Sequence, residues 1–126
     1  MKKRRILFIM SVFVFVFLPV VLFAEGTQAA EKPFKIAVVI PGVTAGSPIY
    51  EQAVIGAKEA VAENPSAEMK VVELGFNQAE WQEKITSIVA TGEYDILLTS
   101  NPAMPFVCME VAEVFPEQKF IILDSY

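Results

Sequence analysis

Beyond residue 33, the chain alternates short runs of branched apolar residues with longer amphipathic segments. The runs cover residues 36–40, 71–74, 96–99 and 120–123, and such runs are typical of strands that are covered on both faces. The segments between them, residues 50–61, 81–89 and 104–115, repeat apolar side chains at helical spacing and end at Pro, Gly or Asn signals. This β-α-β-α-β-α-β pattern predicts an α/β fold, with a parallel sheet and helices on both faces.

Each predicted helix begins with a polar residue that directly follows a strand. Ser47-Pro48 and Asn101-Pro102 place a capping residue before proline, and Asn77 with Glu80 forms an Asx variant of the capping box. Capping alone is one explanation for these residues. Contact with a ligand is another, because ligands of open parallel sheets bind outside the carboxyl ends of the strands.

The predicted carboxyl edge of the sheet also gathers aromatic, amide, hydroxyl and carboxylate side chains. The candidate ligand-binding residues are Ser47, Tyr50, Phe76, Asn77, Trp81, Ser100, Asn101, Asp124 and Tyr126. Tyr50 and Trp81 also start helical stripes, so packing is an alternative role for both. Aromatic faces beside polar groups, without Lys or Arg, suit a neutral heteroaromatic molecule with a sugar or polyol tail rather than an anionic one.

The first 24 residues form a separate segment that resembles an export signal. Four basic residues precede an apolar run over residues 6–23, and the small residue Ala24 follows it. This order predicts a signal peptide over residues 1–24 that is cleaved after Ala24, a linker over residues 25–33, and a folded body over residues 34–126. The run is longer than a usual signal core, so retention as a membrane anchor is the alternative, and both place the body outside the cytoplasmic membrane. No Cys near Ala24 offers a lipid anchor.

Composition excludes several classes of function. Without the first 24 residues, the chain has six basic and 15 acidic side chains. The resulting net charge of −9 would repel a nucleic-acid backbone. The chain has no His and one Cys, which excludes His-dependent triads, His-ligated zinc and disulfide frameworks. Cys108 lies in an apolar helical stretch and is predicted to be a buried small hydrophobe. We therefore expect no cofactor and no metal site.

Four segments of the body stand out as motifs: Lys35-Ile-Ala-Val-Val-Ile-Pro-Gly42, Ser47-Pro-Ile-Tyr-Glu-Gln-Ala-Val-Ile-Gly56, Gly92-Glu-Tyr-Asp-Ile-Leu-Leu-Thr-Ser-Asn101 and Phe115-Pro-Glu-Gln-Lys-Phe-Ile-Ile-Leu-Asp124. In this order they resemble the basic membrane protein family, also called PnrA-like, of ABC-transporter substrate-binding proteins. The resemblance implies a two-lobed protein of the type 1 periplasmic-binding-protein fold, at least twice as long as this chain, that closes on its ligand. Residues 34–126 would then be the N-terminal part of the first lobe, and the resemblance implies a small-molecule ligand and an ABC permease as partners.

The resemblance also bears on the ligand. Members of the family are associated with purine nucleosides, and one branch is associated with riboflavin. Nucleoside-binding members carry an Asp-Asp-x-Ser-Phe-Asn run after the first strand. In this chain Ala45 and Gly46 replace the acidic pair, and Ile49 and Tyr50 replace the Phe and the Asn. This departure favours a riboflavin-like ligand over a purine nucleoside.

Three classes of function remain for the exported body. The first is the substrate-binding component of an ABC importer, and the second is a ligand-sensing receptor domain of the same fold that signals to a membrane partner. The third is an exported enzyme, which would need an acid–base set. The glutamates of the predicted helices belong to solvated faces and leave Asp124 as the one carboxylate at the rim, so the sequence predicts no enzyme. A lobe that ended after its fourth strand would expose a sheet edge and be marginally stable.

Overall fold

The structure is a computed structural model, and it describes residues 32–124. The predicted signal peptide, most of the predicted linker and the candidate ligand residue Tyr126 lie outside the described residues. The elements within them are β1 (Phe34–Ile40), α1 (Pro48–Ala62), β2 (Ala67–Glu73), the short 3-10 helix η1 (Gln78–Glu80), α2 (Trp81–Ala90), β3 (Ile96–Ser100), α3 (Met104–Val114) and β4 (Lys119–Leu123).

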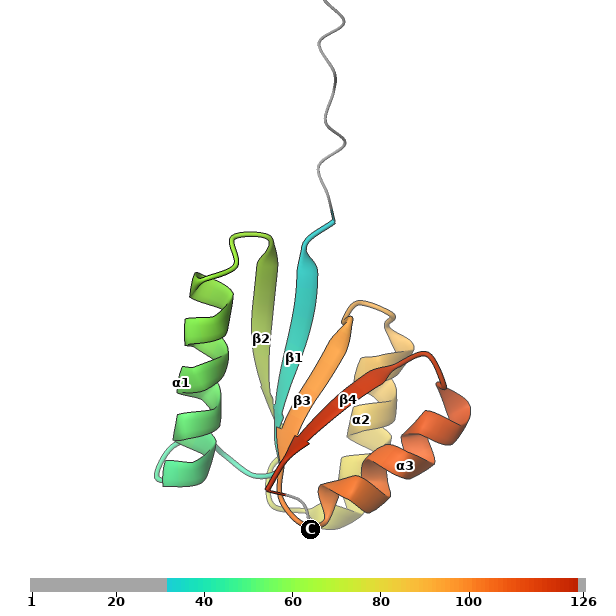
Figure 1. The fold of residues 1–126 in the computed structure, drawn as a ribbon. Coiled ribbons are helices and arrows are strands. Elements are labelled where there is room, and N and C mark those ends of the chain that lie inside the picture. Colours follow the sequence, from blue (N-terminus) through green and yellow to red (C-terminus); the bar gives the residue numbers. More distant parts are fainter. Residues whose placement is uncertain (1–31, 125–126) are drawn as a thin grey trace, which may run out of the picture.

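The four strands form one sheet in the order β2-β1-β3-β4, and every neighbouring pair is parallel (Figure 1). Helix α1 covers one face, whereas α2 and α3 cover the other. The predicted α/β fold with helices on both faces is therefore confirmed. The first crossover runs from β1 to β2 in one direction and the next returns past β1 to β3. Because crossovers are right-handed, this reversal sends the later helices to the opposite face.

Alternation along the central strand β1 divides the apolar residues between two cores. Val38 and Ile40 point toward α1, where they pack with Val54 and Ala57. The larger core on the other face contains Ala37, Val39, Leu74, Trp81, Ile85, Val89, Leu97, Met104 and Val111. The helical stripes of the sequence thus supply the buried faces of α1, α2 and α3, as predicted.

Strand β2 begins at Ala67, four residues before the predicted apolar run. It pairs only with β1 among the described residues, and Glu68 and Lys70 in its first half are exposed. An edge strand has one solvated side chain in two, so its sequence alternates instead of forming a continuous apolar run. The prediction recognised only the apolar second half.

The predicted helix caps differ from the structure in three ways. Ser47 holds the N-cap position of α1 before Pro48, but its side chain makes no cap hydrogen bond. Asn77 precedes η1, and its Nδ2 donates to Glu80 Oε1 at 2.6 Å in place of the predicted bond to a backbone N–H. Helix α3 begins at Met104, because Asn101 Oδ1 accepts the Ala103 N–H at 2.9 Å and closes a turn before the helix.

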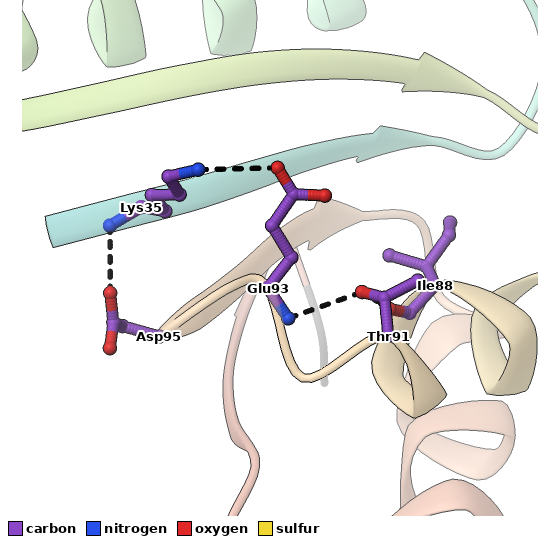
Figure 2. Close-up of polar contacts among 5 residues, drawn as sticks. All are labelled: Lys35, Ile88, Thr91, Glu93 and Asp95. Carbon is purple, nitrogen blue, oxygen red and sulfur yellow. Dashed lines mark hydrogen bonds and ion pairs between the residues drawn. The ribbon is translucent and has the colours of Figure 1, made fainter. Parts of the chain in front are cut away.

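Polar contacts hold the amino end of the sheet, at the entrance to β1 and β3 (Figure 2). The Lys35 N–H donates to Asp95 Oδ2 at 2.8 Å, and Lys35 Nζ lies 3.3 Å from Glu93 Oε1. The Glu93 N–H donates in turn to Thr91 Oγ1 at 3.2 Å, at the end of α2. These groups satisfy one another and tie the turn before β3 to β1, so their role is structural.

Strand β4 pairs only with β3 within residues 32–124 and leaves apolar surface open on the α1 side. Ile121 and Leu123 are 45% and 40% exposed. No helix among these residues is both long and apolar enough to span a membrane.

Candidate functional site

The carboxyl ends of all four strands meet at one edge of the sheet, at the lower end of the molecule in Figure 1. The connection that follows β1 carries the chain to α1 on one face, whereas the connection that follows β3 carries it to α3 on the other. Such a reversal between neighbouring strands opens a crevice outside their carboxyl ends, and this is where parallel α/β sheets bind ligands. The sheet topology therefore agrees with a ligand site at the carboxyl edge, where the sequence predicts one.

A groove of about 490 Å³ lies at this edge, between the first turns of α1 and the ends of β3 and β4. Its lining residues are Pro48, Ile49, Gln52, Ala53, Ser100, Leu123 and Asp124. Two of the predicted site residues, Ser100 and Asp124, thus come together across the groove. The sequence prediction missed Ile49 and Gln52 as lining residues, although their positions in the first turns of a helix directly after Ser47 were a usable signal.

Ser100 is the most informative residue of the groove. It is only 2% exposed as a residue, and it nevertheless lines the groove, so it stands where a ligand can reach it. A hydroxyl both donates and accepts hydrogen bonds, so Ser100 suits a polar ligand atom in the groove.

The amino terminus of α1 borders the same groove. The first N–H groups of a helix have no partner within it, and the Ser47 side chain makes no cap bond. The Glu51 carboxylate instead accepts the Gly46 N–H at 3.0 Å, ahead of the helix. Donors at this helix end are therefore free to bind an acceptor on a ligand.

Asp124 provides the one charged side chain among the residues that line the groove. It is exposed and adopts a left-handed backbone conformation with φ of 56°, which turns the chain as it leaves β4. Its carboxylate would accept hydrogen bonds from hydroxyl or amino groups. The same charge, without a nearby cation in the lining, would disfavour an anionic ligand.

A second group of predicted residues ties two connections together. The Tyr50 hydroxyl donates to the Pro41 carbonyl at 3.1 Å and accepts from Asn101 Nδ2 at 3.3 Å. Residues 41 and 101 follow β1 and β3, so this network fixes the two connections across the switch point. Tyr50 and Asn101 are both partly buried, and the structure uses their polar atoms to shape the edge.

The rings of Phe76 and Tyr50 both lie close to Gly42. A Cβ on Gly42 would stand 3.3 Å from Tyr50 Cε2 and 3.4 Å from Phe76 Cε1. Phe76 is 76% exposed, so its ring offers a free aromatic face at this edge. Neighbouring Asn77 is also exposed, and with Lys84 it holds the Glu80 carboxylate; the hydrogen bond from Lys84 and then that from Asn77 lower the pKa of Glu80.

Trp81 takes a different position from the other predicted site residues. It is 3% exposed within the larger core, and its indole N–H donates to the Gly75 carbonyl at 2.8 Å. This burial favours the packing alternative over contact with a ligand.

No group of three or more Asp, Glu, Cys or His side chains between residues 32 and 124 is placed to hold a metal ion. Cys108 is buried, and burial raises the pKa of its thiol to about 11, which keeps it protonated and unreactive.

The comparison with protein families agrees with this arrangement. A family model described as "ABC transporter substrate-binding protein PnrA-like", with the short name Bmp, matches residues 34–126. The chain belongs to this family. The predicted resemblance is thereby confirmed over the whole body, and the four-stranded parallel sheet is consistent with part of one lobe of a periplasmic-binding protein.

Membership of the PnrA-like family establishes the general role of the chain. The family consists of extracytoplasmic substrate-binding proteins of ABC transporters and is not a family of enzymes. Its members bind small molecules and interact with membrane permeases. A groove at the carboxyl edge, lined by Ser100 and Asp124, is the part of this structure that suits such binding.

Proposed function

We propose that this PnrA-like chain captures a neutral heteroaromatic ligand with a polyol or sugar tail and delivers it to an ABC permease. The observation that carries the proposal is the groove at the switch point of the sheet, where Ser100 and Asp124 come together beside the first turns of α1. The tail's hydroxyl groups would bind Ser100, Asp124 and the first turn of α1. The exposed ring of Phe76 would lie beside the flat part of the ligand.

The ligand class divides into two candidates, riboflavin-like molecules and purine nucleosides. Ile49 lines the groove and is 59% exposed, at the position where nucleoside-binding members place their stacking Phe. An aliphatic side chain offers no aromatic face there, so one contact with a purine base is absent. Riboflavin is therefore the preferred ligand, since Ala45 and Gly46 also lack the carboxylates of the nucleoside-binding run.

Titration of the purified protein with riboflavin, adenosine and guanosine tests the ligand class. Trp81 is the one tryptophan of the chain, and its indole N–H donates to the Gly75 carbonyl near the carboxyl edge of the sheet. Its fluorescence therefore serves as an internal reporter of binding, and calorimetry provides an independent readout. We expect saturable binding of riboflavin, with quenching of flavin emission. Tight nucleoside binding without a flavin response would reverse the preference, and no binding of any of the three would contradict the proposed class.

The same titration with Ser100→Ala tests the site. Loss of one hydrogen bond to a ligand is expected to weaken binding by about 1–3 kcal/mol, while the free energy of unfolding of the unliganded protein changes by less than about 1 kcal/mol. Thr99→Val is the matched control. Thr99 is also 2% exposed with an unpartnered hydroxyl, but it pairs in register with Val39 and faces the larger core. Equal losses of affinity in the two variants would argue against the groove.

We further propose that residues 1–24 direct the body out of the cytoplasm and are cleaved after Ala24. The basic start, the apolar run and the small residue at its end support this. N-terminal sequencing of the protein from a fractionated cell should begin at Glu25. Protein that stays in the cytoplasm with Met1 intact would refute export.

A further inference from the structure

The connection between β1 and α1, residues 41–47, leads directly into the first turn of α1, which lines the groove, and it is held by a set of hydrogen bonds. Backbone bonds fix its beginning, because the Leu74 N–H donates to the Ile40 carbonyl at 2.8 Å and the Gly75 N–H donates to the Gly42 carbonyl at 3.0 Å. Near its end, the Ser47 N–H donates to the Thr44 carbonyl at 3.1 Å. Because the Thr44 carbonyl accepts the Ser47 N–H, the position of Thr44 sets the position of Ser47 at the end of the connection.

Two carboxylates hold that middle part. Glu73 Oε1 accepts the Thr44 N–H at 2.7 Å, and Glu51 Oε1 accepts the Gly46 N–H at 3.0 Å. Glu51 belongs to the first turn of α1 and therefore moves with that helix. Glu73 is the last residue of β2, 29 positions from Thr44, so it alone of these two joins the connection to the sheet.

We propose that Glu73 is a positioning residue of the binding site: its ionised carboxylate holds Thr44 against β2 and thereby places Ser47 and the first turn of α1 at the groove. The inference rests on the proposed function for the meaning of the groove. The tether itself rests on the hydrogen bond alone. A charged acceptor strengthens such a bond relative to a neutral one, so the tether depends on the charge of Glu73.

This dependence predicts a direction with pH. The Thr44 N–H, and secondarily the nearby Thr44 hydroxyl, lower the pKa of Glu73 from its ordinary value of 4.5. A lowered pKa in the folded protein means that the tether is complete above the ordinary pKa and is lost as pH falls through the folded value. The charged groups that line the same depression as Glu73 are Glu80, Glu83 and Lys84. Of these, Glu80 and Lys84 pair with each other at 2.7 Å.

Amide hydrogen exchange followed by NMR on the full chain tests the tether. In Glu73→Ala, the protection factors of Thr44 and Ser47 should fall by about tenfold at neutral pH, while that of Val38 in the sheet stays constant. In Glu73→Gln, the neutral amide oxygen should restore part of the protection and remove its dependence on pH between about 3 and 6. Glu68→Gln is the matched control, because Glu68 is an exposed glutamate on the same strand with no hydrogen bond from this connection.

Unchanged protection of Thr44 in Glu73→Ala would overturn the tether. Loss of protection at Thr44 without a loss at Ser47 would overturn the positioning role, because the effect would then stop short of the groove. If no candidate ligand binds in the titration but the protection factors of Thr44 and Ser47 fall in Glu73→Ala, the proposed ligand class is wrong and the tether stands. The two proposals therefore fail separately.

Discussion

Trp81→Ala is expected to lower the free energy of unfolding by about 3–5 kcal/mol, the usual cost of removing a large aromatic side chain from a packed core. Trp81, the first residue of α2, is 3% exposed and packs in the larger core, on the face of the sheet that α2 and α3 cover. Its indole N–H also satisfies the Gly75 carbonyl. Domains of this size have total stabilities of about 5–15 kcal/mol, so the variant would lose a large share of its folded population.

Trp81→Phe is the control that separates packing from the hydrogen bond. It keeps most of the buried ring and removes the N–H donor, so a smaller loss of about 1–2 kcal/mol is expected. Urea unfolding monitored by circular dichroism measures both variants without relying on the fluorescence of the residue that is replaced. A loss below about 1 kcal/mol for Trp81→Ala would be inconsistent with a core position and would restore ligand contact as its main role.

Asn101→Ala is expected to cost about 2–3 kcal/mol of stability, from two separate causes. The backbone of Asn101 has φ of 122°, a region that Ala adopts only with strain. Its side chain also accepts the Ala103 N–H and donates to the Tyr50 hydroxyl, and both bonds are lost on truncation. The connection that follows β3 would lose its link to Tyr50.

Asn101→Gly isolates the backbone contribution. Glycine loses the same side-chain bonds but accepts a positive φ without steric cost, so this variant should retain about 1 kcal/mol or more of the stability that the alanine variant loses. Thermal and urea unfolding of the two variants under identical conditions gives the difference directly. Equal stabilities would show that the backbone at residue 101 relaxes without strain.

Local sequence pattern was sufficient for most of the fold. Branched apolar runs predicted β1, β3 and β4 within two residues at each end, and helical stripes supplied the buried faces of α1, α2 and α3. These signals act within one segment, because an element needs one apolar face whatever its neighbours are. The polar first half of β2 was missed, since its exposure follows from its place at the sheet edge.

The candidate site depended more on tertiary structure. The sequence selected Ser100 and Asp124 from their places after strands, and the fold brings both to one groove. It also selected Trp81, which the fold buries, and Asn101 as a helix cap, although α3 begins at Met104. A polar or aromatic residue at a strand end has the same local signature whether its side chain turns inward or outward, so packing between elements decides.

By itself, then, the sequence determined a parallel α/β body, its family and the edge of the sheet that carries polar groups. Only the tertiary structure decided the strand order β2-β1-β3-β4, the groove between the first turns of α1 and the ends of β3 and β4, and the Glu73–Thr44 hydrogen bond across 29 residues. The physical reason is range. Periodicity and capping are interactions within a few residues, whereas a groove or a tether requires separate segments to meet, and their meeting depends on the register and the crossovers of the whole sheet.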